Sequence, residues 1–317
     1  GHGPAWGNSL FEDNAEFGLG MHVANETIRH RIQMIMEANV DKAPNAVAAL
    51  YKDWLEFRND REKSAQIRDL LVPLLEANPT APGADVILSL KQYIAKKSQW
   101  IFGGDGWAYD IGYGGVDHVL ASKEDINVVV LDTEVYSNTG GQSSKSTPTG
   151  AIAQFAAGGK ETKKKVLAGI AMSYGYVYVA HISMGADMNQ CVKALAEAEA
   201  YPGPSLIIAY APCINHGIKK GMSKAQTEEQ LAVECGYWNN FRYNPAAEGD
   251  KFSLDSKAPK AEGYQDFLNG EVRYNALKRS NPEKAARLFK KNEQEAMERY
   301  DYLNKLVTVY AAEKEDK

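Results

Sequence analysis

Apolar and polar positions alternate along the central part of the chain in a way that predicts strands separated by helices. Between the strands, apolar residues recur at helical spacing near residues 113–120, 152–156 and 187–200. Strands that alternate with helices in this way indicate a parallel sheet with helices on both faces and right-handed crossovers. We therefore predict a three-layer α/β fold with a mainly parallel sheet. The predicted strands are short, β-branched runs bounded by Gly, Pro or Asp, at residues 99–102, 126–131, 176–180 and 205–210.

The periodicity becomes purely helical between residues 24 and 97. Pro44 stands where a second helix would begin, a position that tolerates proline. A third helix should end at the turn-forming run 78–83. We interpret residues 24–97 as a helical insertion. The glycine-rich stretch 1–22 before it could be a docking loop or a surface connection.

The carboxyl-terminal part has a different pattern. Residues 239–281 lose the periodicity and carry several Pro and Gly, which favours a surface tail or a linker. A last helix begins with Asn281 as its cap and Pro282 at its first position. We predict one domain over residues 1–240, containing the insertion, and a carboxyl-terminal extension over 241–317 that ends in a helical arm.

Composition narrows the class of protein. The 317 residues include 44% hydrophobic and 24% charged residues, as in ordinary globular proteins, and the net charge is −5. Because the chain is not basic overall, we do not expect it to bind nucleic acid. No apolar run approaches the ~20 residues that span a bilayer. Three cysteines are too few for a disulfide framework, so we expect a reducing cytoplasm. The chain lacks an initiator Met, and we expect it to be part of something longer.

Candidate chemistry gathers after the first two predicted strands. Residues 103–107 follow the first strand and residues 132–141 follow the second. In open α/β sheets, ligands bind beyond the carboxyl ends of the strands. The two stretches together offer a carboxylate, hydroxyls, backbone carbonyls and N–H groups, which suit a divalent cation carrying a diphosphate.

Two common nucleotide motifs are absent at these positions. Tyr109 occupies the place of the third glycine of a dinucleotide fingerprint, and the residue before Lys145 is not the glycine of a P-loop. What remains is Asp105 between two glycines, followed about thirty residues later by Asn138. This spacing is typical of thiamine diphosphate binding.

The residues around both motifs resemble the thiamine domain of pyruvate:ferredoxin (flavodoxin) oxidoreductases. The likeness is strongest over residues 104–112 and 131–142, and it extends over residues 1–240, including 6–14 and 211–217. The resemblance implies that Mg²⁺ is bound by the side chains of Asp105 and Thr133 and by the carbonyl of Val135. From the residues alone, Thr133 could not be preferred over Asp132 as a ligand. The resemblance further implies that the diphosphate is lined by Gly104, Asp105, Gly106, Trp107, Thr133, Glu134, Val135, Tyr136, Ser137 and Asn138, and that Asn138 supports catalysis.

Cys213 has several interpretations. A lone cysteine after a strand is most often a small apolar filler, and a Cys-x-x-His pair with His216 supplies too few ligands for zinc. The resemblance implies that Cys213 is one ligand of a 4Fe–4S cluster whose other ligands lie outside this chain. We interpret Cys191 and Cys235 as structural. The runs 163–165 (Lys) and 228–229 (Glu) are expected to be solvated faces.

The resemblance implies oxidative decarboxylation of pyruvate with coenzyme A, giving acetyl-CoA and CO₂. Electrons would pass through iron–sulfur clusters to ferredoxin or flavodoxin, and the full enzyme would be a homodimer. Alternatives are another thiamine-dependent 2-oxoacid oxidoreductase or decarboxylase, and a non-catalytic cofactor-binding subunit. Cys213 favours the redox enzyme, since a decarboxylase has no need of a cluster ligand there.

Overall fold

The computed structural model describes residues 12–312, which divide into two compact units. Residues 17–99 form one unit. Residues 12–16 and 100–312 form the other, which contains the sheet. Within residues 12–312, no helix is long and apolar enough to cross a membrane.

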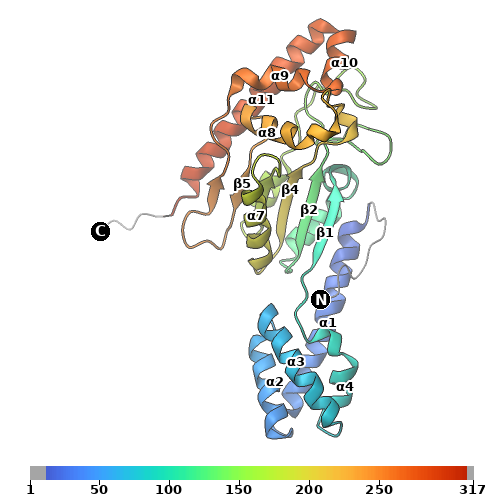
Figure 1. The fold of residues 1–317 in the computed structure, drawn as a ribbon, viewed down its shortest axis with the longest axis vertical. Coiled ribbons are helices and arrows are strands. Elements are labelled where there is room, and N and C mark those ends of the chain that lie inside the picture. The colour runs from blue at the N-terminus through green and yellow to red at the C-terminus, as the bar shows by residue number, and fades with distance from the viewer. Residues whose placement is uncertain (1–11, 313–317) are drawn as a thin grey trace, which may run out of the picture. The chain divides into compact units, whose positions relative to one another are not determined.

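A six-stranded sheet is the centre of the larger unit (Figure 1). The strand order is β1-β2-β4-β3-β5-β6, and the first four strands are parallel. The mainly parallel α/β sheet that the sequence predicts is therefore confirmed. The strands are β1 (Trp100–Gly104), β2 (Asn127–Asp132), β3 (Tyr178–Ile182), β4 (Ser205–Tyr210), β5 (Phe241–Tyr243) and β6 (Phe252–Leu254).

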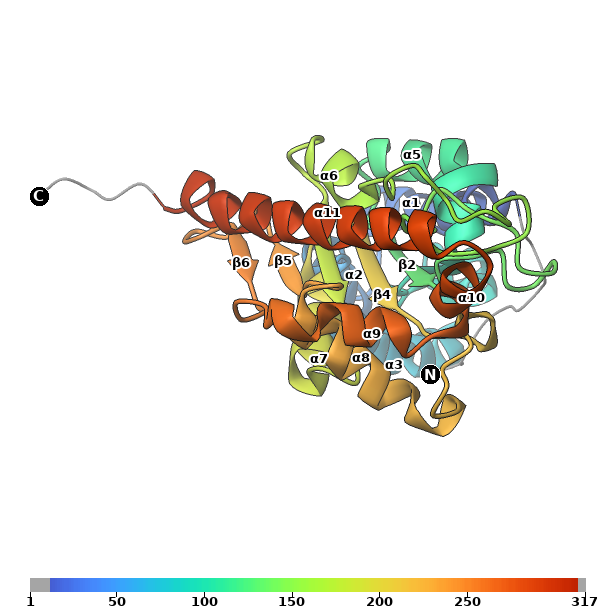
Figure 2. The ribbon, with the colours of Figure 1, turned by 90° about the horizontal axis from the view of Figure 1, so that it is seen from above.

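Helices lie on both sides of the sheet (Figure 2). On one face, α7 (Met188–Ala200) buries Cys191, Ala194 and Ala198 against alternate residues of β3. On the other lie α5 (Tyr113–Ala121), α6 (Leu167–Met172) and α11 (Pro282–Val309). Strands buried on both faces account for the nearly continuous apolar runs in the sequence.

The helix expected near residues 152–156 was wrong. The chain there forms a loop, closed by a backbone hydrogen bond of 2.7 Å from the Gly150 N–H to the Lys160 carbonyl. Gly150 and Phe155 both have positive φ values, +84° and +64°, which a helix does not allow. Phe155 is also 91% exposed, so its apolar side chain marks no buried helix face.

The expectation of a surface tail or a linker over residues 239–281 was also wrong. This stretch contributes β5 and β6, which pair antiparallel at the edge of the sheet. It continues with α9 (Tyr264–Asn269) and α10 (Val272–Ser280), whose buried residues include Tyr264 and Leu277. The cap of α11 is as expected, since Asn281 Oδ1 accepts a hydrogen bond of 3.0 Å from the Lys284 N–H. All of these elements belong to the compact unit of the sheet.

The smaller unit is helical. Its helices are α1 (Asn14–Asn39), α2 (Asn45–Phe57), α3 (Arg61–Ala77), α4 (Ala84–Ser89) and the 3-10 turn at Lys91–Tyr93. Tyr51 and Trp54 are fully buried in its core. Two boundaries differ from expectation, because α1 begins within the stretch taken as a glycine-rich connection and α4 ends well before residue 97. The reading of residues 24–97 as an insertion, and the domain boundary at residue 240, stay predictions.

Candidate functional site

The two predicted loops meet because β1 and β2 are adjacent and parallel. Gly104 at the end of β1 pairs with Leu131 near the end of β2. Asp105 and Thr133 therefore leave neighbouring strands at the same edge of the sheet. The Thr133 hydroxyl lies 2.8 Å from Asp105 Oδ1 and 3.0 Å from the Val135 carbonyl oxygen.

This spacing suits a hard cation. Neighbouring oxygens around an octahedral Mg²⁺ lie about 3.0 Å apart when each is about 2.1 Å from the metal. The Thr133 hydroxyl has one proton and faces two acceptors, so one acceptor is available to a cation. The side chains and carbonyl assigned to Mg²⁺ from the sequence are therefore brought together, and their chemistry fits the ion.

Asp105 is almost completely buried, with 1% of its surface exposed. It accepts a hydrogen bond of 2.6 Å from the Ser144 hydroxyl, and the Thr133 N–H donates to it at 3.2 Å. Burial, together with the nearby Asp132 carboxylate, raises the pKa of Asp105 to about 7. A cation beside Asp105 would favour its charged form.

Asp132 has a different role from Thr133. Its carboxylate accepts hydrogen bonds from the Tyr109 hydroxyl at 2.9 Å, the Ser146 hydroxyl at 2.5 Å and the Glu134 N–H at 3.1 Å. It also lies 2.9 Å from the Lys164 ammonium. With both oxygens engaged in this way, Asp132 ties loops together, whereas Thr133 faces the other two candidate ligands.

Lys164 corrects the interpretation of the lysine run as a solvated face. Its side chain is only 16% exposed and lies between Asp132 and Glu134, 2.8 Å from the Glu134 carboxylate. Burial alone would lower the pKa of Lys164, but the two carboxylates hold it above its usual value. Burial would likewise raise the pKa of Glu134, but Lys164 and Arg273 bring it down to about 2.

The acidic pair at residues 228–229 was misassigned for the same reason. Glu228 and Glu229 are each only 4% exposed. The Glu229 carboxylate accepts hydrogen bonds from the Ser183 hydroxyl at 3.1 Å and from the Gly185 N–H at 2.9 Å. A run of charged residues in the sequence therefore did not predict that these side chains are exposed.

The glycines of the first loop are required by close packing. A Cβ on Gly103 would lie 2.2 Å from the ring of Trp107, and a Cβ on Gly106 would lie 2.5 Å from the ring of Tyr136. The Trp107 ring thus occupies the space beside Gly103, and the whole residue is buried.

In the second loop, the Tyr136 N–H donates to the Gln142 carbonyl at 2.9 Å, which closes the turn. Asn138 stands exposed in that turn, and Ser137 Oγ lies 3.4 Å from the Thr133 hydroxyl.

Cys213 and His216 occupy the loop after β4. Cys213 is a half-buried free thiol. His216 is fully buried, and its Nε2 donates to the Thr133 carbonyl at 2.8 Å. Among residues 12–312 no group of three or more His, Cys, Asp or Glu could hold a metal, so the described residues around Cys213 do not complete a cluster site. The contact of His216 with Thr133 could not be predicted from the sequence, because only the fold brings residues 133 and 216 together.

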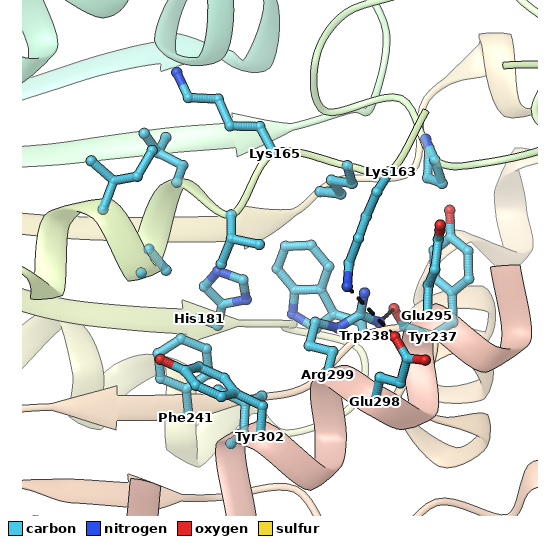
Figure 3. Close-up of a pocket in the computed structure, with 18 of the residues that line it drawn as sticks. Lys163, Lys165, His181, Tyr237, Trp238, Phe241, Glu295, Glu298, Arg299 and Tyr302 are labelled. Carbon is cyan, nitrogen blue, oxygen red and sulfur yellow. Dashed lines mark hydrogen bonds and ion pairs between the residues drawn. The ribbon is translucent and has the colours of Figure 1, made fainter. Parts of the chain in front are cut away.

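A cavity of about 690 Å³ lies beside Lys164 and Glu134, between the segment 163–173 and α11 (Figure 3). Lys164 and Glu134 line it, so it adjoins the second loop. Figure 3 shows Lys163 reaching toward Glu298, 3.9 Å away, with the His181 and Trp238 rings nearby. His181 and Trp238 are stacked, with ring centroids 4.7 Å apart.

Several known proteins are similar to this chain. Residues 60–209 match the family described as "Thiamine pyrophosphate enzyme, C-terminal TPP binding domain". The pyruvate-flavodoxin oxidoreductase of Enterobacter agglomerans is 54% identical over 97% of this chain. The pyruvate:ferredoxin oxidoreductase of Moorella thermoacetica is also 54% identical, over 96% of this chain. The chain belongs to the pyruvate:ferredoxin (flavodoxin) oxidoreductase family.

The resemblance seen in the sequence is thus confirmed, and the similarity to these relatives also extends beyond residue 240. The thiamine pyrophosphate-binding domain is matched over residues 60–209, which include β1 to β4. A mitochondrial pyruvate dehydrogenase (NADP+) of Euglena gracilis is 50% identical over 92% of this chain. The chain spans about a quarter of the first two relatives, 27% of each, and 16% of the Euglena protein.

Proposed function

We propose that the two loops bind the diphosphate end of thiamine diphosphate through Mg²⁺. Asp105 and Thr133 would bind the ion by their side chains and Val135 by its carbonyl. The observation that carries this assignment is the position of the Thr133 hydroxyl, 2.8 Å and 3.0 Å from the other two oxygens. Gly104, Gly106 and the backbone of Trp107 would line the diphosphate from the first loop, and residues 133–138 from the second.

The protein's own residues position the cation and the cofactor. When bound, thiamine diphosphate supplies the nucleophilic carbon and the electron sink that decarboxylation of a 2-oxoacid requires. Ser144 fixes one oxygen of Asp105, which leaves the other directed at Thr133. Asn138, exposed at the tip of its turn, would act on the substrate side.

We further propose that the longer protein oxidatively decarboxylates pyruvate with coenzyme A, with ferredoxin or flavodoxin as electron acceptor. The names and identities of the relatives support this assignment. Cys213 would be one ligand of a 4Fe–4S cluster, and its half-buried free thiol is compatible with that role. A reducing cytoplasm and a homodimer of the full enzyme belong to the same proposal.

The activity is tested with the native assembly purified without oxygen. We expect reduction of a viologen dye that requires both pyruvate and coenzyme A. A preparation that contains thiamine diphosphate and iron but reduces no dye would refute the proposed activity.

The cation assignment is tested with Asp105→Asn. Because the substitution removes the charge but keeps the shape, the Mg²⁺ concentration needed to retain thiamine diphosphate should rise at least about ten-fold. Asp110→Asn is the matched control, since Asp110 lies in the same segment but pairs with Lys145 at 2.6 Å. Equal cofactor retention by the two variants after gel filtration would contradict the assignment.

A further inference from the structure

The segment between the two ligands of the second loop has an unusual backbone conformation. Glu134 stands between Thr133 and Val135 and has a φ of +59°. A residue other than glycine adopts this left-handed conformation at a cost, and keeps it only where the surrounding structure enforces it. The conformation of Glu134 sets the direction of the Thr133 side chain relative to the Val135 carbonyl. Whatever holds Glu134 therefore shapes the cation site.

The Glu134 carboxylate is held from the carboxyl-terminal part of the chain. Arg273, at the start of α10, donates to it at 2.9 Å, and the Tyr237 hydroxyl donates at 2.5 Å. Arg273 is only 6% exposed and Glu134 1%. Between two buried side chains a charged hydrogen bond restricts both partners strongly.

Thr133, at one end of residues 133–135, is held by His216, which lies against Glu271 of the carboxyl-terminal part. His216 Nε2 donates to the Thr133 carbonyl, and His216 Nδ1 lies 3.6 Å from the Glu271 carboxylate. The other oxygen of Glu271 accepts a hydrogen bond of 2.6 Å from Arg273 Nε. Glu271 and His216 are both fully buried. Glu271 and Arg273, which are bonded to each other, thus reach residues 133–135 at two points. Arg273 contacts Glu134 directly, and Glu271 reaches Thr133 through His216.

The backbone fixes this arrangement in place. The Val272 N–H donates to the Gly217 carbonyl at 2.8 Å, and the Lys219 N–H donates to the Gly270 carbonyl at 3.0 Å. These bonds join the start of α10 to the turn that follows Cys213. Gly217 has a φ of +64°, and a Cβ there would lie 2.6 Å from Val272, so the close approach requires glycine.

We propose that Glu271 and Arg273 are positioning residues of the cation site, which hold Thr133 and Val135 in ligating orientation through His216 and Glu134. This inference rests on the proposed Mg²⁺ site. It assigns a role in cofactor binding to the carboxyl-terminal part, although that part is far in sequence from Asp105 and Thr133.

The test compares Arg273→Met with Arg242→Met in the native assembly. Arg242 is the matched control because it also bridges two carboxylates, Glu197 at 2.7 Å and Asp255 at 2.8 Å, and its hydrogen bonds and ion pairs among the described residues do not reach residues 133–135. We expect Arg273→Met to raise the Mg²⁺ concentration for half-maximal retention of thiamine diphosphate by about ten-fold or more. Arg242→Met should change it less than about two-fold, even where both variants lower the melting temperature.

A second readout separates positioning from stability. With Mn²⁺ in place of Mg²⁺, Arg273→Met should alter the electron paramagnetic resonance spectrum of the bound ion, because the ligands move. Arg242→Met should leave that spectrum unchanged. If Arg273→Met does not fold, Glu134→Gln takes its place, with the same rise in Mg²⁺ requirement expected.

The outcomes distinguish this inference from the function on which it rests. If the unsubstituted protein retains no thiamine diphosphate with Mg²⁺, the proposed cation site fails. If it does retain the cofactor, and Arg273→Met or its substitute matches the Arg242→Met control in Mg²⁺ requirement and spectrum, the positioning role alone is refuted.

Discussion

Replacing Lys164 with Met should destabilise the sheet unit far more than the same change at the adjacent Lys163. Lys164 lies 2.9 Å from Asp132 and 2.8 Å from Glu134, and both carboxylates are buried. Methionine fills similar space but leaves Asp132 with hydrogen bonds and no cation. Removing one partner of a buried pair costs about 3–5 kcal/mol, because the remaining charge is left uncompensated.

Lys163 provides the comparison within the same lysine run. Its side chain is 50% exposed and lies 3.9 Å from Glu298, itself 55% exposed. Pairs of this kind contribute at most about 1 kcal/mol, so Lys163→Met should be nearly neutral.

Melting temperature followed by circular dichroism measures the difference. One kcal/mol shifts the midpoint by roughly 2–4 °C in a unit of this size, so Lys164→Met should lower it by roughly 6–20 °C. The two variants should be compared at one pH near 7, with thiamine diphosphate and Mg²⁺ absent, because bound ligand would stabilise the folded state. Midpoints for Lys164→Met and Lys163→Met within about 2 °C of each other would refute the view that Lys164 compensates two buried charges.

Two further substitutions test packing and pH dependence. Gly103→Ala places a methyl group 2.2 Å from the Trp107 ring and should lower the free energy of unfolding, measured by chemical denaturation, by about 1–3 kcal/mol. Gly114→Ala is the control and should not destabilise the protein, because nothing lies within 4 Å of the added methyl group. Equal denaturation midpoints for the two variants would contradict the close packing. Burial, with the nearby Glu271 carboxylate, raises the pKa of Glu228 from 4.5 to about 7. The folded chain therefore keeps a proton that the unfolded chain loses, and this contribution to stability is complete below about pH 4.5 and lost as pH rises to about 7. Glu228→Gln should flatten that decline, which denaturation at pH 5 and 7.5 would detect; an unchanged slope would contradict the shift.

The sequence by itself determined the local elements and the place of the candidate site. Branched apolar runs specified β2 and β4 closely, since strands buried on both faces leave a nearly continuous apolar signature. The cap at Asn281 specified the start of α11, because capping depends on residues only three positions apart. That the stretches after β1 and β2 meet also followed, because parallel strands bring their carboxyl ends to one edge of the sheet. Which of Asp132 and Thr133 faces Asp105 did not follow from the residues alone.

The tertiary structure alone decided which charged residues are buried and which residues hold the loop 133–135 in place. Lys164 looks like part of an ordinary surface run, and it is buried only because Asp132 and Glu134 compensate its charge. Arg273 contacts Glu134 across 139 positions of sequence, and His216 contacts Thr133 across 83. The short strands β5 and β6 were missed for a related reason, because three-residue strands gain their stability from the sheet they join and carry little pattern of their own. A residue's own sequence neighbours favour a local conformation, but the cost of burying its charge depends on partners that only the fold supplies.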